Sequence, residues 1–120
     1  MTIKDFITKE ELKETMEIAR RIRKKFGTDA YILFKKLATV AALQGGWNGY
    51  VNYAYFLKNT NYVLSTNRSP SDILHFKYKL MYKTKIYNTN PDDIVNKSYQ
   101  ELFADLYERR EIYFMTHDKA

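Results

Sequence analysis

Apolar residues recur three and four residues apart along much of this chain, which is the spacing of one face of an α-helix. The first such stretch follows Thr8, which can form a capping box with Glu11 at a helix start. Gly27 supplies a helix stop. We therefore predict a helix between Thr8 and Gly27. Its predicted apolar face consists of Leu12, Met16, Ile18, Ala19, Ile22 and Phe26.

The most continuously apolar stretch runs from Thr28 to Trp47 and predicts a central helix. Thr28 can cap this helix, and the pair Gly45–Gly46 can end it. A helix that is apolar around most of its circumference is buried on most sides. We therefore expect this helix to form the core. Its polar edge is confined to Lys35, Lys36 and Thr39.

A third helix is predicted to begin near Asn48, directly after the glycine pair. Val51 and Lys58 would share one of its faces, and Tyr53 and Leu57 another. Residues 59–69 are rich in Asn, which favours turns, so we predict a connector with a short extended piece at 62–64.

Two further helix starts combine a capping residue, a proline and acidic residues: Ser69–Pro70 and Asn90–Pro91. The segment 76–86 after the first start has both helical spacing and strict alternation. We predict a helix that becomes extended after Leu80, with a half-buried strand as the alternative. The second start introduces either one last helix or a short helix followed by a long one.

These elements predict an all-α fold, one domain over residues 1–120 with about five helices. The alternative is an α+β fold in which residues 76–86 form a strand.

The charge of the chain narrows the classes of partner. Its net charge is +6, and the charge is segregated, with +9 over residues 1–88 and −3 over residues 89–120. A basic protein favours nucleic acid or an acidic protein surface as its partner. No apolar run reaches the ~20 residues of a membrane span, and no apolar leader follows Met1, so we expect a cytoplasmic protein with no membrane partner.

The segment from Leu37 onward has the spacing of a helix–turn–helix unit. Gly45 lies four residues after Ala41, where the turn needs a residue with positive φ. The small or apolar positions that accompany it are Val40, Ala41, Val51 and Ala54. Over about twenty residues, this pattern resembles the helix–turn–helix units of phage repressors.

That resemblance implies that the helix after Gly45–Gly46 reads DNA. Asn can pair with adenine in the major groove, and Tyr and Lys can hold phosphates. Gln44 and Gly46 depart from the pattern, since apolar residues are usual there, and an ordinary tight corner between core helices remains the alternative. The residues predicted to contact DNA are Asn48, Tyr50, Asn52, Tyr53 and Lys58.

Two basic clusters are further candidates for phosphate contact. One is interleaved with aromatic residues that could stack on bases, and it comprises Lys77, Lys79, Lys83 and Lys85. The other comprises Arg20, Arg21, Arg23, Lys24 and Lys25. The alternatives are edge lysines that limit aggregation for the first cluster and a solvated helix end for the second.

Enzyme chemistry finds little support in the sequence. There is no cysteine, the only histidines are His75 and His117, and no zinc, phosphate-loop or nucleophile-elbow motif occurs. We therefore expect no enzyme, no cofactor and no metal. Our first hypothesis is a small basic nucleic-acid-binding accessory or regulatory protein, with a homodimer among its assemblies.

The alternative hypothesis is a protein–protein interaction module. The chain has eleven tyrosines, a residue type favoured at protein interfaces. Such a module could be an inhibitor from a phage or mobile element that docks on a host nuclease or defence protein. Its partner would be an acidic or a nucleic-acid-binding protein.

Overall fold

The computed structural model describes residues 3–44, 53–67, 69–84 and 90–108. Over these ranges the chain forms helices and no strand, which confirms the predicted all-α fold. The elements are η1 (Ile3–Asp5), α1 (Lys9–Phe26), α2 (Thr28–Gln44), α3 (Tyr53–Thr66), η2 (Pro70–Asp72), α4 (Ile73–Lys83), α5 (Pro91–Asn96) and α6 (Tyr99–Glu108). None of the helices in these ranges is both long and apolar enough to cross a membrane.

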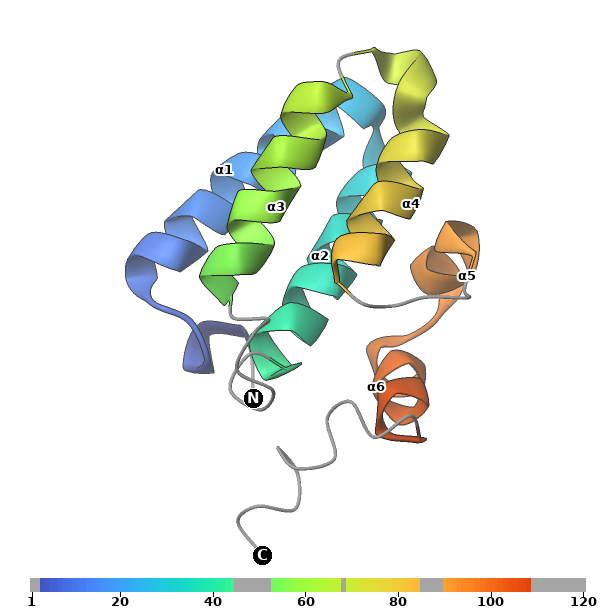
Figure 1. The fold of residues 1–120 in the computed structure, drawn as a ribbon. Coiled ribbons are helices and arrows are strands. Elements are labelled where there is room, and N and C mark those ends of the chain that lie inside the picture. The colour runs from blue at the N-terminus through green and yellow to red at the C-terminus, as the bar shows by residue number, and fades with distance from the viewer. Residues whose placement is uncertain (1–2, 45–52, 68, 85–89, 109–120) are drawn as a thin grey trace, which may run out of the picture.

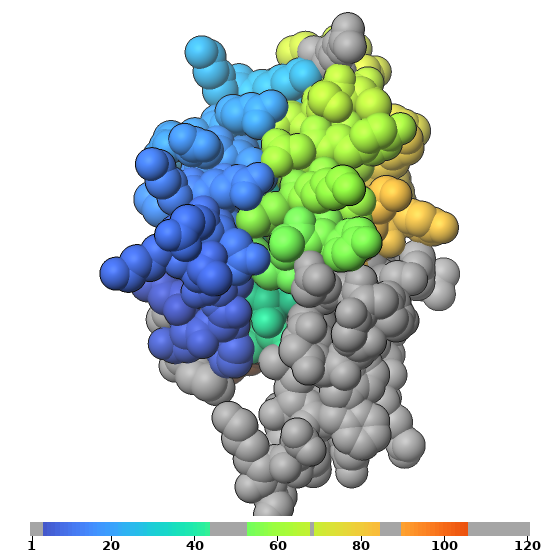
Figure 2. Space-filling model, turned by 60° about the vertical axis from the view of Figure 1, so that its left-hand side comes forward, coloured from blue at the N-terminus to red at the C-terminus, as the bar shows by residue number. Residues whose placement is uncertain are grey.

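Helices α1 to α4 run alternately up and down, and α5 packs beside α2 and α4, with α6 beyond it (Figure 1). Three contacts fix α3 in parallel with α1. The hydroxyls of Thr15 and Tyr53 lie 2.8 Å apart, Arg21 donates to the Asn61 side chain at 3.1 Å, and Lys25 donates to a carbonyl oxygen further along α3 at 3.4 Å. Figure 2 shows α1 and α3 side by side on one face of the molecule.

A single glycine joins α1 to α2. Gly27 has a φ of 96°, a conformation that side chains disfavour, so glycine is needed at this position. Its N–H donates to the carbonyl of Arg23 at 3.0 Å, and its carbonyl accepts from the N–H of Tyr31 at 3.2 Å. The predicted stop at Gly27 and the predicted capping box of Thr8 and Glu11 are both confirmed.

The core is centred on α2, as its apolar sequence predicts. The rings of Phe34 on α2 and Phe56 on α3 stack on each other, with their centroids 5.6 Å apart. Phe26 and Phe76, at 4.5 Å, tie the end of α1 to α4. Each such side chain contributes about 1.5–3 kcal/mol by leaving water. Fully buried residues of α2 are Ala30, Leu33, Phe34, Leu37, Val40 and Ala41.

One predicted core position of α1 is wrong. Met16 is 54% exposed, and the neighbouring Thr15 is buried in its place. Thr15 can be buried because its hydroxyl donates to the carbonyl of Glu11 at 2.7 Å and meets the hydroxyl of Tyr53. A threonine that satisfies its hydrogen bonds inside the core leaves Met16 on the outer side of the helix.

The predicted connector at residues 59–69 is also wrong, since α3 continues to Thr66 and includes the supposed extended piece at 62–64. Its buried positions recur at helical spacing: Tyr53, Phe56, Leu57, Thr60, Val63 and Leu64. Packing of this stripe outweighs the weak helix propensity of the Asn and Thr residues between them. Val51 lies outside the described residues, and its predicted partner Lys58 is exposed.

The strand alternative for residues 76–86 is overturned as far as the structure describes them. Helix α4 continues to Lys83, so the predicted change to extended chain after Leu80 does not occur there. The N–H of Thr84 still donates to the carbonyl of Leu80 at 3.2 Å. Residues 85 and 86 lie outside the described ranges.

The C-terminal part is a short helix followed by a longer one, one of the two arrangements predicted. The Asn90 side chain accepts from the N–H of Asp92 at 2.9 Å and starts α5. Ser98 and Glu101 form reciprocal hydrogen bonds at the start of α6. Lys36 of α2 donates to the carbonyls of Ile94 at 3.3 Å and Val95 at 2.6 Å, and also to that of Lys97.

Candidate anion-binding face on α1 and α2

The charges of α1 are divided between two sides of the helix. At about 3.6 residues per turn, an arc of its circumference passes through basic and apolar residues with no Asp or Glu between them. The residues along this arc are Leu12, Arg23, Met16, Lys9, Arg20, Lys13 and Lys24. The carboxylates lie elsewhere on α1, and Glu14 accepts from the Asn61 side chain of α3 at 3.2 Å.

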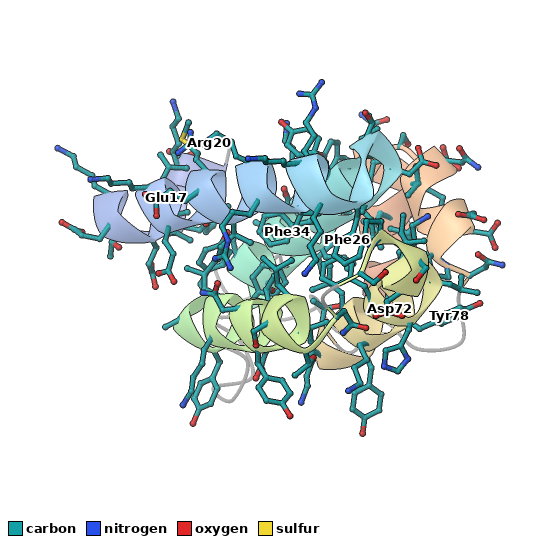
Figure 3. All side chains as sticks on the ribbon, turned by 90° about the horizontal axis from the view of Figure 1, so that it is seen from above. Glu17, Arg20, Phe26, Phe34, Asp72 and Tyr78 are labelled. Atoms are coloured by element: carbon teal, nitrogen blue, oxygen red, sulfur yellow. The ribbon has the colours of Figure 1, made fainter. Side chains whose placement is uncertain are left out.

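Helix α2 extends this basic arc. Tyr31, Lys35 and Thr39 follow one another on its side toward α1, while its one acidic residue, Asp29, falls on the side of Lys36. We call the combined surface the basic face. It consists of Lys9, Lys13, Arg20, Arg23 and Lys24 of α1 and Lys35 of α2, all exposed. In Figure 3, Arg20 lies on the edge of α1 away from α3.

Within the described ranges, none of these cations forms a salt bridge. The salt bridges within the described ranges join Lys77 to Asp92, at 3.4 Å, and Lys97 to Asp105. Neither involves the basic face. The end of the α1 dipole offsets only about half a unit charge, so most of the positive charge faces solvent.

Tyr31 positions two of the cations. The guanidinium carbon of Arg23 lies 5.2 Å from the centroid of its ring, and the ammonium of Lys35 lies 5.3 Å from it. Each contact is worth about 0.5–1 kcal/mol at an exposed site. The ring thus holds one cation from each helix at the junction of α1 and α2.

A groove of about 280 Å³ runs between the two helices within this face. Its walls come from Leu12, Met16 and Arg20 on one side and from Tyr31 and Lys35 on the other. Smaller side chains complete the lining, namely Thr15, Ala19, Ala38 and Thr39. The groove is therefore apolar at its base and cationic at its edges.

Of the residues predicted to contact DNA, the structure describes only Tyr53 and Lys58. Asn48, Tyr50, Asn52 and Lys85 lie outside the described residues. Tyr53, in contrast, is buried, and burial raises the pKa of its hydroxyl to about 12. A side chain in that position cannot reach a phosphate, so Tyr53 leaves the candidate set.

The two basic clusters are divided by the fold. Lys77 is buried beside Asp92, so it leaves the candidate set. Lys79 and Lys83 lie on α4, whereas the Arg20–Lys25 run lies on α1, and Lys58 is exposed on α3. Arg21 and Lys25 turn toward α3. Arg20, Arg23 and Lys24 remain on the basic face.

The sequence reading missed Lys9, Lys13 and Lys35. For the first two, the signal was the absence of acidic residues around one side of the predicted helix. Lys35 joins them only because α2 folds back on α1 at Gly27, a feature of tertiary structure.

The proposed turn of the helix–turn–helix unit and the start of its second helix fall on residues 45–52, which the structure does not describe. In such units the second helix crosses the first at roughly 90–120° and enters the major groove. The described part of α3 instead runs antiparallel to α2, the helix before the proposed turn, and buries one side along its length (Figure 1).

Comparison with protein-family models, curated proteins and solved structures finds no match to this chain. Over the described residues, no three His, Asp or Glu side chains gather as a metal site requires. Any function must therefore be argued from the surface itself.

Proposed function

We propose that this protein binds nucleic acid without catalysis, through contacts between the basic face and backbone phosphates. The observation that carries the proposal is the arrangement of six exposed cations on two adjoining helices, with no carboxylate between them around the helix. Within the described residues, none of the six forms a salt bridge. Such a surface attracts phosphates and gains free energy by releasing their counterions.

The length of the face suits a nucleic-acid backbone. Lys9 and Lys24 are fifteen residues apart, or about 22 Å along a helix. Phosphates recur about every 3.4 Å along one strand of a duplex, so several fall within that length. Phosphate contacts position a protein without reading sequence, and we therefore expect binding with little sequence preference.

The experiment compares two charge-reversed variants that change the net charge equally. Lys13→Glu with Lys24→Glu alters the basic face. Lys58→Glu with Lys79→Glu alters exposed or half-exposed lysines on α3 and α4. Binding to a labelled duplex and to a labelled single strand is measured by fluorescence anisotropy at ~50 mM salt, where phosphate contacts are strong.

We expect the first variant to lose at least tenfold in affinity and the second to lose only what a general change in net charge causes. Circular dichroism of both variants checks that the helices remain. Equal losses in both variants, or a larger loss in the second, would contradict the assignment to the basic face.

A further inference from the structure

The groove inside the basic face has a different chemistry from the cations around it. A phosphate backbone needs positive charge and gains nothing from an apolar groove. We propose that this groove is a docking site for an acidic amphipathic helix of a partner protein. The inference goes beyond nucleic-acid binding and does not depend on it.

The base of the groove suits an apolar helix face. Ala19 and Ala38 are small, so a third helix can approach α1 and α2 closely, as helix packing requires. Leu12 is half-buried and Met16 is 54% exposed, and both offer apolar surface. Methionine adapts its shape to a partner and is common at helix-binding surfaces.

The volume also favours a side chain over a larger ligand. About 280 Å³ lies just below the ~300–1,000 Å³ range of pockets for small molecules and cofactors. An open groove of this size can accept one anchoring apolar residue of a helix, with the rest of that helix lying along α1 and α2.

The edges of the groove specify the charge of the occupant. Arg20 flanks it on α1 and Lys35 flanks it on α2. Arg23 and Lys35 both lie over the Tyr31 ring, so this ring already has cations against it where a nucleobase would need to stack. Charge complementarity therefore favours carboxylates on both sides of an apolar stripe.

The acidic helix α6 is not the occupant. Helix α6 carries Glu101 and Asp105, but its Leu102 is only 1% exposed and belongs to the core of the same molecule. An acidic helix from another protein would cover Arg20 and Lys35, so it would compete with nucleic acid for the basic face.

The probe is a fluorescein-labelled 18-residue peptide with leucines three and four residues apart and glutamates on both flanks. Two control peptides replace either the leucines by serine or the glutamates by lysine. We expect the first peptide to bind at least tenfold more tightly than either control in fluorescence anisotropy. Equal binding of the glutamate and lysine peptides would overturn the proposal.

A variant locates the binding on the protein. Met16→Gln removes apolar surface from the groove without changing charge, and Leu74→Gln, at a residue 60% exposed on α4, is the matched control. We expect Met16→Gln to weaken peptide binding at least fivefold and to leave oligonucleotide binding unchanged, with Leu74→Gln affecting neither. Equal weakening of peptide binding by both variants would contradict the location.

Methionine methyl NMR gives a direct readout. On adding the peptide, the Met16 methyl signal should shift, while that of Met81, 3% exposed in the core, should not. Three further results would overturn the proposal: no binding of the glutamate peptide, oligonucleotide binding that Met16→Gln weakens, or self-association that Met16→Gln abolishes. The second result would assign the groove to a nucleobase and the third to a second copy of this chain.

Discussion

At the scale of single residues, Lys35 and Lys36 are neighbours in the sequence with opposite roles. Lys35 is exposed on the basic face. The ammonium of Lys36 instead meets three carbonyl oxygens around the end of α5 and lies 5.8 Å from the Tyr99 ring centroid. A cation at a helix C-terminus satisfies carbonyls that lack a partner within the helix. Lys36 therefore fastens α5 and α6 to α2.

Replacing this lysine should destabilise the C-terminal helices. We expect Lys36→Met to cost about 1.5–3 kcal/mol, the range for hydrogen bonds to a charged group, because the carbonyls lose their donor. Urea unfolding gives the free energy, and amide hydrogen exchange shows whether α5 and α6 open first. Lys35→Met, the control, should stay within about 0.5–1 kcal/mol, since it loses only a cation–π contact. Equal costs in the two variants would argue against the fastening role.

Tyr53 makes a prediction about pH. Its pKa is raised to about 12 by burial, whereas the unfolded chain has a tyrosine pKa of about 10. The unfolded state therefore loses this proton first, and Tyr53 contributes stability below pH ~10 that is lost as the pH rises toward ~12. Tyr53→Phe should cost about 1 kcal/mol at neutral pH by removing the contact with Thr15.

Stability curves of both proteins between pH 9 and ~12 test this account of Tyr53. We expect a smaller loss of stability across this interval in Tyr53→Phe than in the unaltered protein. Other tyrosines and lysines titrate in both proteins, so the difference between the curves isolates Tyr53. Parallel curves would show that Tyr53 ionises as it does in the unfolded chain.

At the scale of elements, capping residues in the sequence predicted where helices start and end, whereas packing between residues far apart in the sequence could not be predicted. Thr8, Gly27, Ser69 and Asn90 start or end helices as predicted, because capping involves residues only a few positions apart. The second half of α3 was missed because α3 is stabilised by packing on α1, α2 and α4, which overrides residue propensity. The burial of Thr15 and the exposure of Met16 were missed for a similar reason. Thr15 is satisfied inside the core by Tyr53, which is thirty-eight residues away in the sequence.

A proline substitution tests whether residues 59–66 are helical. Tyr62 is 58% exposed on α3. We expect Tyr62→Pro to cost about 3 kcal/mol or more, because proline removes a helical hydrogen bond and clashes with the preceding turn. Tyr62→Ala, the control, should change stability by less than about 0.5 kcal/mol. Thermal or urea unfolding measures the stability of both variants. A Tyr62→Pro protein as stable as Tyr62→Ala would indicate that residues 59–66 form a connector and not a helix.

At the scale of the whole molecule, the sequence predicted the class of site but not its place. The net charge and the Arg20–Lys25 run pointed to an anionic partner, and three members of that run remain on the basic face. Which cations share a surface depends on how the helices pair. Lys35 joins α1 through the turn at Gly27, while Arg21 and Lys25 are drawn to α3. No local pattern contains that information.

The central claim is that the basic face binds nucleic acid through phosphates, and the salt dependence of affinity tests it most directly. The logarithm of the binding constant should fall linearly with the logarithm of salt concentration. In Lys13→Gln with Lys24→Gln, this slope should become shallower by about 1.4 for a single strand or about 1.8 for a duplex, since two phosphate contacts are lost. No binding of either nucleic acid at ~50 mM salt, or the same slope in both proteins, would contradict the claim.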